Sequence, residues 1–150
     1  MVGIGYDSHR FANGRPLILG GVEVEHEQGL EGHSDADVLT HAVIDALLGA
    51  AGGGDIGTMF PPEDERWRGA DSIDMLRTVI GTLPTAVRNV DATLICERPR
   101  LGPYRDEMER LLSEVTSARV SVKATSNEGM GWIGRGEGIA CIAVAMLEGE

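Results

Sequence analysis

The stretch "NVDATLICERPRLGPYRDEMERLLSEVTSARVSVKAT", residues 89–125, decides the fold of this chain. Residues 89–97 and 118–125 are strand-like, and residues 104–115 between them carry apolar side chains at helical spacing. A strand, a helix and a second strand in this order make a βαβ unit, whose crossover is expected to be right-handed. The unit predicts two parallel strands and therefore an α/β class of fold.

Further strands are predicted towards both ends of the chain. Residues 2–6 read as a strand, and residues 16–25, "PLILGGVEVE", read as a hairpin that turns at Gly20-Gly21. Residues 138–147, "GIACIAVAML", are apolar at both odd and even positions. This pattern is typical of a strand that is covered on both faces.

The remaining segments predict helices and one long loop. A helix is expected from Ser34, taken as its N-cap, to the glycine-rich run at residues 49–54, and a second over residues 71–83 with Ser72 as its cap. Residues 52–70 are rich in Gly, Pro and charge, and a loop of this length indicates either function or disorder. With no internal repeat, residues 1–150 are interpreted as a single α/β domain.

Composition excludes several classes of function. The net charge is −11 and no basic cluster is present, which argues against a nucleic-acid partner. No apolar run approaches the roughly 20 residues of a membrane span, so we expect no membrane association. Cys96 and Cys141 lie in apolar runs typical of packed, reduced thiols. A cytoplasmic location is therefore expected.

Asp7 and His9 form a candidate metal-ligand pair. At positions i and i+2 of an extended segment their side chains project from the same side. "GHSDADVLTHA" supplies two further histidines, His33 and His41. An Asp-x-His pair with one more histidine leaves one coordination position open, as a catalytic zinc site requires. Hydrogen-bonded structural histidines are the alternative, and the residues alone leave both open.

Two glycine-containing segments are candidates for phosphate binding. "GHSD", at the start of the first predicted helix, offers backbone N–H groups and the Ser34 hydroxyl, and "GGGDIG" offers bare backbone around Asp55. The alternative is that these glycines only end a helix and turn the chain. An acidic protein that binds a phosphate also needs a local source of positive charge, such as divalent cations.

Several strings, in their order and spacing, resemble the 2-C-methyl-D-erythritol 2,4-cyclodiphosphate synthase family of the non-mevalonate isoprenoid pathway. They are "GYDSHRF", "GHSDADVLTHAVIDALLGA", "GDIGTMFP", "RGADS", "NVDATLICERPRLGPYRDEM" and "VKATSNEGMGWIGRGEGIACIAVAML". "HSDADVL" with its following histidine and "GRGEGIA" are the most specific. The likeness runs from about residue 3 to residue 147.

The resemblance implies a fold, an assembly and a reaction. The fold is an α/β (α+β) domain with a mostly four-stranded mixed sheet, helices packed on one face and a small β-hairpin. The assembly is a homotrimer with active sites between subunits. The enzyme is a phosphorus-oxygen lyase that converts 4-diphosphocytidyl-2-C-methyl-D-erythritol 2-phosphate into the cyclic diphosphate and CMP. The substrate's own 2-phosphate attacks the β-phosphorus, so no protein nucleophile is required.

The resemblance also implies the metals and the site residues. Asp7, His9 and His41 are expected to hold one Zn²⁺ per active site, while Mg²⁺ or Mn²⁺ bridges the substrate diphosphate and contacts Glu128. His33 and Ser126 take catalytic roles. The substrate-binding residues are Asp7, His9, His33, Ser34, Asp55, Gly57, Phe60, Asp64, Cys96, Arg100, Leu101, Gly102, Thr125, Ser126, Glu128, Trp132 and Arg135.

Within this set the resemblance assigns different parts of the ligand to different segments. Asp55 and Gly57 contact the erythritol hydroxyls, residues 60–64 form a loop over the substrate, and residues 96–102 form the cytidine pocket. The loop departs from the family pattern "FPDTD" by reading "FPPED". Arg135 is expected near an isoprenoid diphosphate on the threefold axis.

Two functions of other classes remain as alternatives. One is a metal-dependent phosphohydrolase, in which water replaces the internal nucleophile and the product is linear. The other is a non-catalytic sensor that binds an isoprenoid diphosphate. On the same helix, Asp37 and Asp45 lie four residues either side of His41, so either is a candidate to orient its imidazole.

Overall fold

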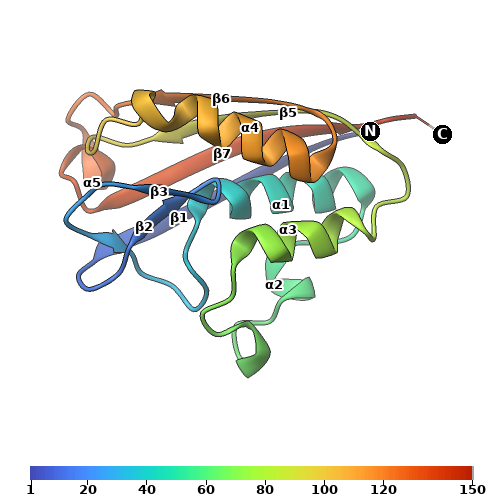
Figure 1. Ribbon diagram of the computed structural model, residues 1–150, viewed down its shortest axis with the longest axis horizontal. Helices are drawn as coiled ribbons and strands as arrows, with labels where there is room; N and C mark the ends of the chain where they lie inside the picture. The colour runs from blue at the N-terminus through green and yellow to red at the C-terminus, as the bar shows by residue number, and fades with distance from the viewer. Residues whose placement is uncertain (150) are drawn as a thin grey trace.

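A computed structural model describes residues 1–149, which contain a five-stranded mixed sheet in the order β4-β1-β7-β5-β6 (Figure 1). The strands are β1 (Val2–Ala12), β4 (Gly29–Leu30), β5 (Val87–Ile95), β6 (Arg119–Thr125) and β7 (Gly138–Leu147). β7 runs antiparallel to both β1 and β5, whereas β5 and β6 are parallel. Since β4 has only two residues, the four long strands are the mostly four-stranded mixed sheet of the expected α+β fold.

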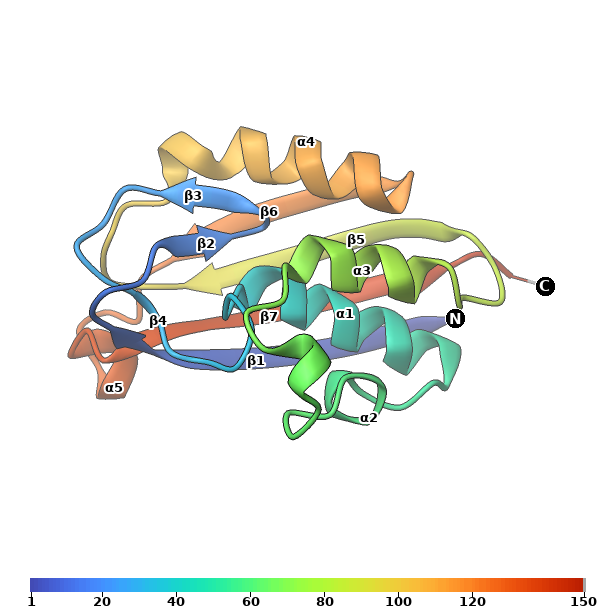
Figure 2. The same ribbon diagram turned by 60° about the horizontal axis from the view of Figure 1, so that its bottom comes forward.

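The long helices lie on one side of this sheet (Figure 2). They are α1 (Val38–Ala51), α3 (Ser72–Ile80) and α4 (Arg105–Thr116), and the short helices are α2 (Ile56–Met59) and α5 (Gly131–Gly134). Two 3₁₀ turns, η1 (Glu65–Trp67) and η2 (Gly102–Tyr104), precede α3 and α4. α1 packs on β1 and β7, α4 on β6, and α3 on both α1 and α4. A single core of buried apolar side chains fills the space between sheet and helices.

The predicted βαβ unit is confirmed as β5, α4 and β6. Residues 89–95 of β5 pair in parallel with residues 119–125 of β6. α4 begins after η2 and buries Met108, Leu112 and Thr116. These positions are four residues apart, so they form one stripe that faces the sheet.

The hairpin is also confirmed, and it explains where α1 begins. β2 (Leu17–Leu19) and β3 (Val22–Val24) pair around Gly20-Gly21, both of which have positive φ. The Asp37 carboxylate accepts from the backbone N–H of both glycines and of Thr40. Asp37 therefore caps α1, and the prediction of Ser34 as the N-cap is wrong because the chain turns through a left-handed Ala36 before the helix starts.

Two more boundaries differ from the predictions. α3 is capped by Asp71, which accepts from Ile73 N–H, so Ser72 is the first helical residue and not the cap. β1 continues beyond residue 6 because residues 2–10 pair with β7 and residues 11 and 12 pair with β4. Local periodicity predicts that the strand ends at the first polar residues, whereas pairing with β7 and β4 extends β1 to Ala12.

A close backbone contact sets the spacing between β1 and α1. A Cβ atom at Gly3 would lie 2.0 Å from the carbonyl oxygen of Ala46, and one at Gly5 would lie 2.0 Å from that of Ala42. Both contacts are impossible for any residue with a side chain. Glycine on the strand and alanine on the helix therefore let the two backbones approach much more closely than larger residues allow.

The sheet face opposite the helices is apolar over β1 and β7. Three cross-strand pairs, Val2 with Met146, Ile4 with Val144 and Tyr6 with Ile142, point to that face. All six side chains are exposed. β7 was predicted to be covered on both faces, but residues 1–149 of this chain cover only the helical face. We refer to these six residues as the apolar sheet face.

Candidate metal centre and surrounding site

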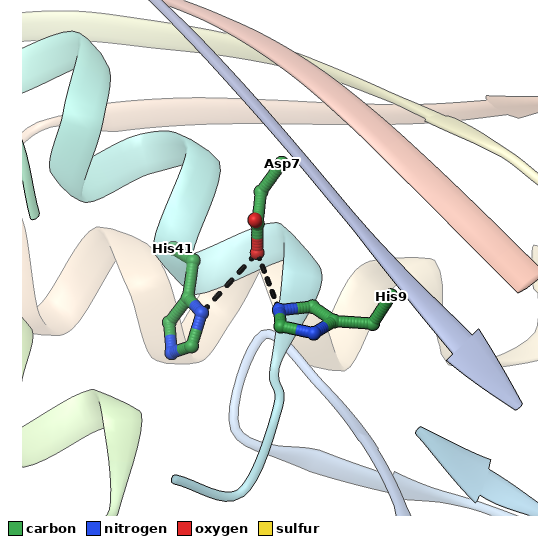
Figure 3. A group of neighbouring side chains, drawn as sticks. All are labelled: Asp7, His9 and His41. Carbon is green, nitrogen blue, oxygen red and sulfur yellow. Dashed lines mark hydrogen bonds and ion pairs between the residues drawn. The ribbon is translucent and has the colours of Figure 1, made fainter. Parts of the chain in front are cut away.

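Asp7, His9 and His41 converge on one point (Figure 3). The distance from Asp7 Oδ2 is 2.8 Å to His9 Nε2 and 3.2 Å to His41 Nδ1. One ligand atom from each residue lies within 4.8 Å of the others. Ligands bound tetrahedrally at about 2.0–2.2 Å from one Zn²⁺ lie about 3.3–3.6 Å apart. The cluster therefore has the composition and the size of a group that could supply three ligands to one metal ion.

Two elements supply this cluster. Asp7 and His9 continue the side of β1 on which Gly3 and Gly5 face α1. His41 lies in the first turn of α1, 34 residues after Asp7. Because Gly5 lets the backbone of α1 approach β1 near Ala42, the imidazole of His41 reaches the Asp7 carboxylate.

The hydrogen bonds of His9 test whether the cluster fits a metal. His9 Nδ1 lies 2.8 Å from the backbone carbonyl oxygen of Glu31. A carbonyl only accepts, so Nδ1 carries a proton and the lone pair of the neutral ring belongs to Nε2. Nε2 is buried, and although it is close to Asp7 it makes no aligned hydrogen bond among the described residues. A cation between His9 and Asp7 would be bound by this buried lone pair and by the Asp7 carboxylate.

Electrostatics favour an ion pair between Asp7 and His9 in the metal-free cluster. Burial opposes the charge on Asp7, but contacts with His41 and His9 outweigh it and hold the pKa of Asp7 below its ordinary value. Burial likewise opposes the charge on His9, yet Asp7 and the Glu31 carbonyl raise the pKa of His9 above its ordinary value. A proton on His9 therefore competes with a metal ion for the same nitrogen.

This competition predicts a pH-dependent stabilisation by zinc. The raised pKa of His9 stabilises the metal-free fold fully below about pH 6.5, and that contribution is lost as pH rises through the folded-state pKa. As the proton leaves His9, its nitrogen becomes available to zinc. The increase in melting temperature caused by zinc should therefore grow as pH rises through this range. Thermal melts with zinc and with chelator between about pH 5.5 and 8.5 measure it. An increment that stays constant over this range would contradict the competition.

Serine hydroxyls surround the second nitrogen of His41. His41 Nε2 lies 2.8 Å from Ser72 Oγ and 3.2 Å from Ser34 Oγ. The suggestion that Asp37 or Asp45 orients His41 is wrong. Asp37 is used by the hairpin and the cap of α1, and Asp45 accepts from the backbone N–H of Ile56, which ties α2 to α1. Helical spacing placed these acids near His41, but each has another partner.

The segment between α1 and α3 contacts His33, which lies before α1. His33 is half-buried, its Nε2 lies 3.4 Å from the backbone oxygen of Asp64, and its backbone oxygen accepts from Gly69 N–H. Phe60 is buried and packs edge-to-face on Trp67, with ring centroids 4.8 Å apart. The run expected to be a loop is thus partly helical, and Phe60 anchors it to the core with its ring against Trp67.

Asp55 and Gly57 lie at the exposed start of α2. Asp55 caps this helix by accepting from the backbone N–H and the hydroxyl of Thr58, and these hydrogen bonds lower the pKa of Asp55. An ionised, exposed carboxylate suits the expected task of binding hydroxyl groups. The Asp64 side chain, by contrast, is held by Arg66 in an exposed ion pair.

The residues expected to bind the nucleotide and the second metal ion lie at or beyond the ends of β5 and β6. Thr125 ends β6, and Ser126 and Glu128 follow it, all exposed. Cys96 and Leu101 are buried after β5, whereas Arg100 and Gly102 are exposed. β7 and β5 separate β6 from β1, so β6 lies about 14 Å from β1. One chain therefore does not bring these residues together with the metal cluster.

Both cysteines behave as packed thiols, as expected. Cys96 and Cys141 are buried and free. Burial raises the pKa of Cys96 to about 12, and it raises the pKa of Cys141 well above its ordinary value. Neither thiol is poised to act as a nucleophile.

The helix α5, which contains Trp132 and is followed by Arg135, lies at the end of the molecule away from the chain termini (Figure 1). Trp132, on α5, lines a surface pocket together with Ser8, His9, Arg10 and Glu137. Arg135 Nε donates to Glu137 Oε2 at 2.9 Å in an exposed ion pair. Sequence reasoning did not select Ser72 or Asp35 for the surroundings of His41. The "RGADS" string contains Ser72, but nothing local relates that residue to His41.

The fold and the cluster together define a small α+β domain with a candidate metal centre and no helix, within residues 1–149, that could cross a bilayer. The chain belongs to the YgbB family, whose model matches residues 1–148. A protein of Symbiobacterium thermophilum named 2-C-methyl-D-erythritol 2,4-cyclodiphosphate synthase is 55% identical over 156 residues, which cover 100% of this chain and 99% of that protein.

Two solved structures are similar over nearly the whole chain. The bifunctional IspDF of Campylobacter jejuni has a TM-score of 0.91 at 36% identity, and the match covers 96% of this chain and 41% of that longer protein. A 2C-methyl-D-erythritol-2,4-cyclodiphosphate synthase in its CDP-bound form has a TM-score of 0.88 at 35% identity, with 99% of this chain and 100% of that one covered. Both likenesses agree with the fold expected from the sequence.

Proposed function

We propose that this chain is a lyase of isoprenoid biosynthesis that converts 4-diphosphocytidyl-2-C-methyl-D-erythritol 2-phosphate into 2-C-methyl-D-erythritol 2,4-cyclodiphosphate and CMP. Its family and its full-length relatives support this reaction. The observation that carries the proposal is the convergence of Asp7, His9 and His41, because three such ligands can hold a metal ion that keeps one position open for a phosphate oxygen.

Asp7, His9 and His41 would hold Zn²⁺, and Glu128 would contact Mg²⁺ or Mn²⁺ on the diphosphate. Bound at these positions, the two ions would neutralise the phosphate oxygens and make the β-phosphorus more electrophilic. Their charge would also allow a chain with a net charge of −11 to bind an anionic substrate.

The other residues of the chain would bind and align the substrate. In the proposed reaction a 2-phosphate oxygen forms a bond to the β-phosphorus, and the bond from that phosphorus to the bridging oxygen breaks, so CMP leaves with the electron pair. Asp55 would accept hydrogen bonds from the erythritol hydroxyls, while Ser34 and Ser126 would donate to phosphate oxygens. His33 would donate to the phosphoryl group as its charge develops. Alignment of two reacting groups within one substrate is a large part of such catalysis.

We propose that the active form is a homotrimer in which each active site combines residues of two subunits. The apolar sheet face supports this, because a chain with a charge of −11 needs an apolar contact to associate with copies of itself. The separation of β6 from β1 is a second support. With this separation, the metal residues and the nucleotide residues of one chain would belong to different active sites.

Ile4 tests the trimer, since it is 71% exposed and lies in the middle of the apolar sheet face. Ile4→Asp should leave the chain folded but convert trimers into monomers in light scattering, because it places a charge in the contact. Activity should fall by about a hundredfold or more, since the site is divided between subunits. We also propose that an isoprenoid diphosphate binds near Arg135 on the threefold axis, and Ile4→Asp protein should no longer bind it.

Thr78→Asp is the matched control, because it adds the same charge to the exposed side of α3. It should remain trimeric and active. Trimeric, active Ile4→Asp protein would contradict the proposed interface.

The reaction itself is tested by incubating the protein with the cytidyl substrate and Mg²⁺, before and after removal of zinc. Phosphorus NMR should show the cyclic diphosphate together with CMP, and both should disappear when zinc is removed. Release of CMP with a linear product would instead identify a phosphohydrolase. Binding of an isoprenoid diphosphate without any turnover would identify a sensor.

A further inference from the structure

A chain of three polar groups lies behind His41, on the side away from Asp7. His41 Nε2 is 2.8 Å from Ser72 Oγ. Ser72 Oγ is in turn very close to Asp35 Oδ1, and Ser72 N–H donates to Asp35 Oδ2 at 3.0 Å. Ser72 is fully buried, with an exposed fraction of 0%. The contact is therefore shielded from water, which would otherwise compete for each hydrogen bond.

The direction of each hydrogen bond follows from the chemistry of Asp35. An ionised carboxylate only accepts, so the hydroxyl proton of Ser72 points at Asp35. The remaining lone pairs of Ser72 Oγ face His41 Nε2, and Ser72 can meet this nitrogen only as an acceptor. Nε2 must then carry a proton. In the neutral ring that a metal ion requires, this leaves Nδ1, the nitrogen near Asp7, as the ring atom with a lone pair.

Backbone hydrogen bonds hold the three groups in place. Asp35 N–H donates to the backbone oxygen of Ala70 at 3.1 Å, and Gly69 N–H donates to that of His33 at 2.8 Å. The Asp35 carboxylate also accepts from Asp37 N–H. The segment before α1 and the segment before α3 are thus joined beside His41, and neither Asp35 nor Ser72 is free to change partner.

We propose that Ser72 and Asp35 are positioning residues that hold His41 with Nδ1 directed at the metal. The inference rests on the proposed zinc site and adds the groups that tune one of its ligands. Outer partners of this kind orient a ligating histidine, and their loss weakens metal binding by about 10–100-fold. Ser34 Oγ, at 3.2 Å from the same nitrogen, is the more distant acceptor and accepts from Ala36 N–H as well.

Zinc affinity of the full-length protein, measured by competition with a chromophoric chelator, tests the proposal. Ser72→Ala should bind zinc about 10–100-fold more weakly than the wild type. Thr78→Ala is the matched control, because it removes a hydroxyl from the same helix at an exposed position. It should bind zinc as the wild type does. Melting temperatures of the metal-free variants show whether each is folded.

Proton NMR of the zinc-loaded protein supplies a readout that a purely structural role would not change. The Nε2–H proton of His41 should exchange slowly with water in the wild type and in Thr78→Ala, and much faster in Ser72→Ala. Asp35→Asn should also weaken zinc binding. The variant that combines Ser72→Ala and Asp35→Asn should have the same zinc affinity as whichever single variant binds zinc less tightly, because both residues act through one hydrogen-bond chain.

The outcomes separate the two proposals. A wild-type protein that binds no zinc would overturn the metal site. A wild-type protein that binds zinc, with Ser72→Ala equal to it in affinity and in Nε2–H exchange, would overturn the positioning role while the metal site stands. Additive losses in the double variant would also overturn the single chain of hydrogen bonds.

Discussion

Replacing His9 by alanine should lower kcat/KM for CMP release by about a thousandfold or more, which corresponds to about 4 kcal/mol of transition-state stabilisation. Two ligands from Asp7 and His41 hold zinc much less well than three. His9 is only half-buried, so its loss should leave the fold intact. Metal content by mass spectrometry, together with phosphorus NMR of the products, measures both parts of the expectation.

His26→Ala is the control for this variant. His26 is a histidine of similar burial that packs near Phe11, with ring centroids 5.4 Å apart, and it lies outside the metal cluster. It should keep its zinc and its activity within about threefold. If His9→Ala protein retained zinc at the wild-type level and full activity, the cluster would have no role in the reaction.

Replacing Gly5 by alanine should destabilise the protein by at least about 3 kcal/mol. The new methyl group would lie 2.0 Å from the carbonyl oxygen of Ala42 and 2.7 Å from the backbone nitrogen of Ala46. Both atoms belong to the helix backbone, so no side chain can move aside, and α1 must shift away from β1. A loss of this size is a large part of the about 5–15 kcal/mol that stabilises a typical domain.

Urea unfolding measures this loss, with Gly81→Ala as the control. Gly81 has a helical φ of −66° and ordinary contacts, so alanine there should change stability by less than about 1 kcal/mol. Gly5→Ala should also weaken zinc binding, because the shift separates His41 from Asp7. Wild-type stability for Gly5→Ala would contradict the close contact between β1 and α1.

Local patterns were sufficient for most of the architecture. The βαβ unit over residues 89–125, the hairpin at Gly20-Gly21 and the final strand all follow from periods of 2 and 3.6 residues and from turn chemistry. Asp7 and His9 could be paired because two positions on one strand share a side whatever the rest of the chain does. His41 entered through a resemblance between strings, because spacing alone left His33 as an equal candidate.

Most of the predictions that failed concern helix starts and side-chain partners, besides the end of β1 and the covering of β7. Ser34 and Asp37 are both good capping residues, and only the hairpin, whose two glycine N–H groups bind Asp37, decides between them. Asp45 has the right spacing to orient His41 but binds Ile56 instead. Polar side chains with several available donors choose among them by tertiary packing, which no local period records.

The sequence by itself predicts an α/β fold, two of the three ligands of the candidate metal centre, and two buried thiols. Folding decides the rest: it brings His41 to Asp7 across 34 residues, and it sets Ser72 behind His41 by joining the segments before α1 and α3. The reason is physical. Periodicity records which side of an element is buried, whereas the distance between two elements depends on the smallest residues at their contact, here Gly3 and Gly5 against α1.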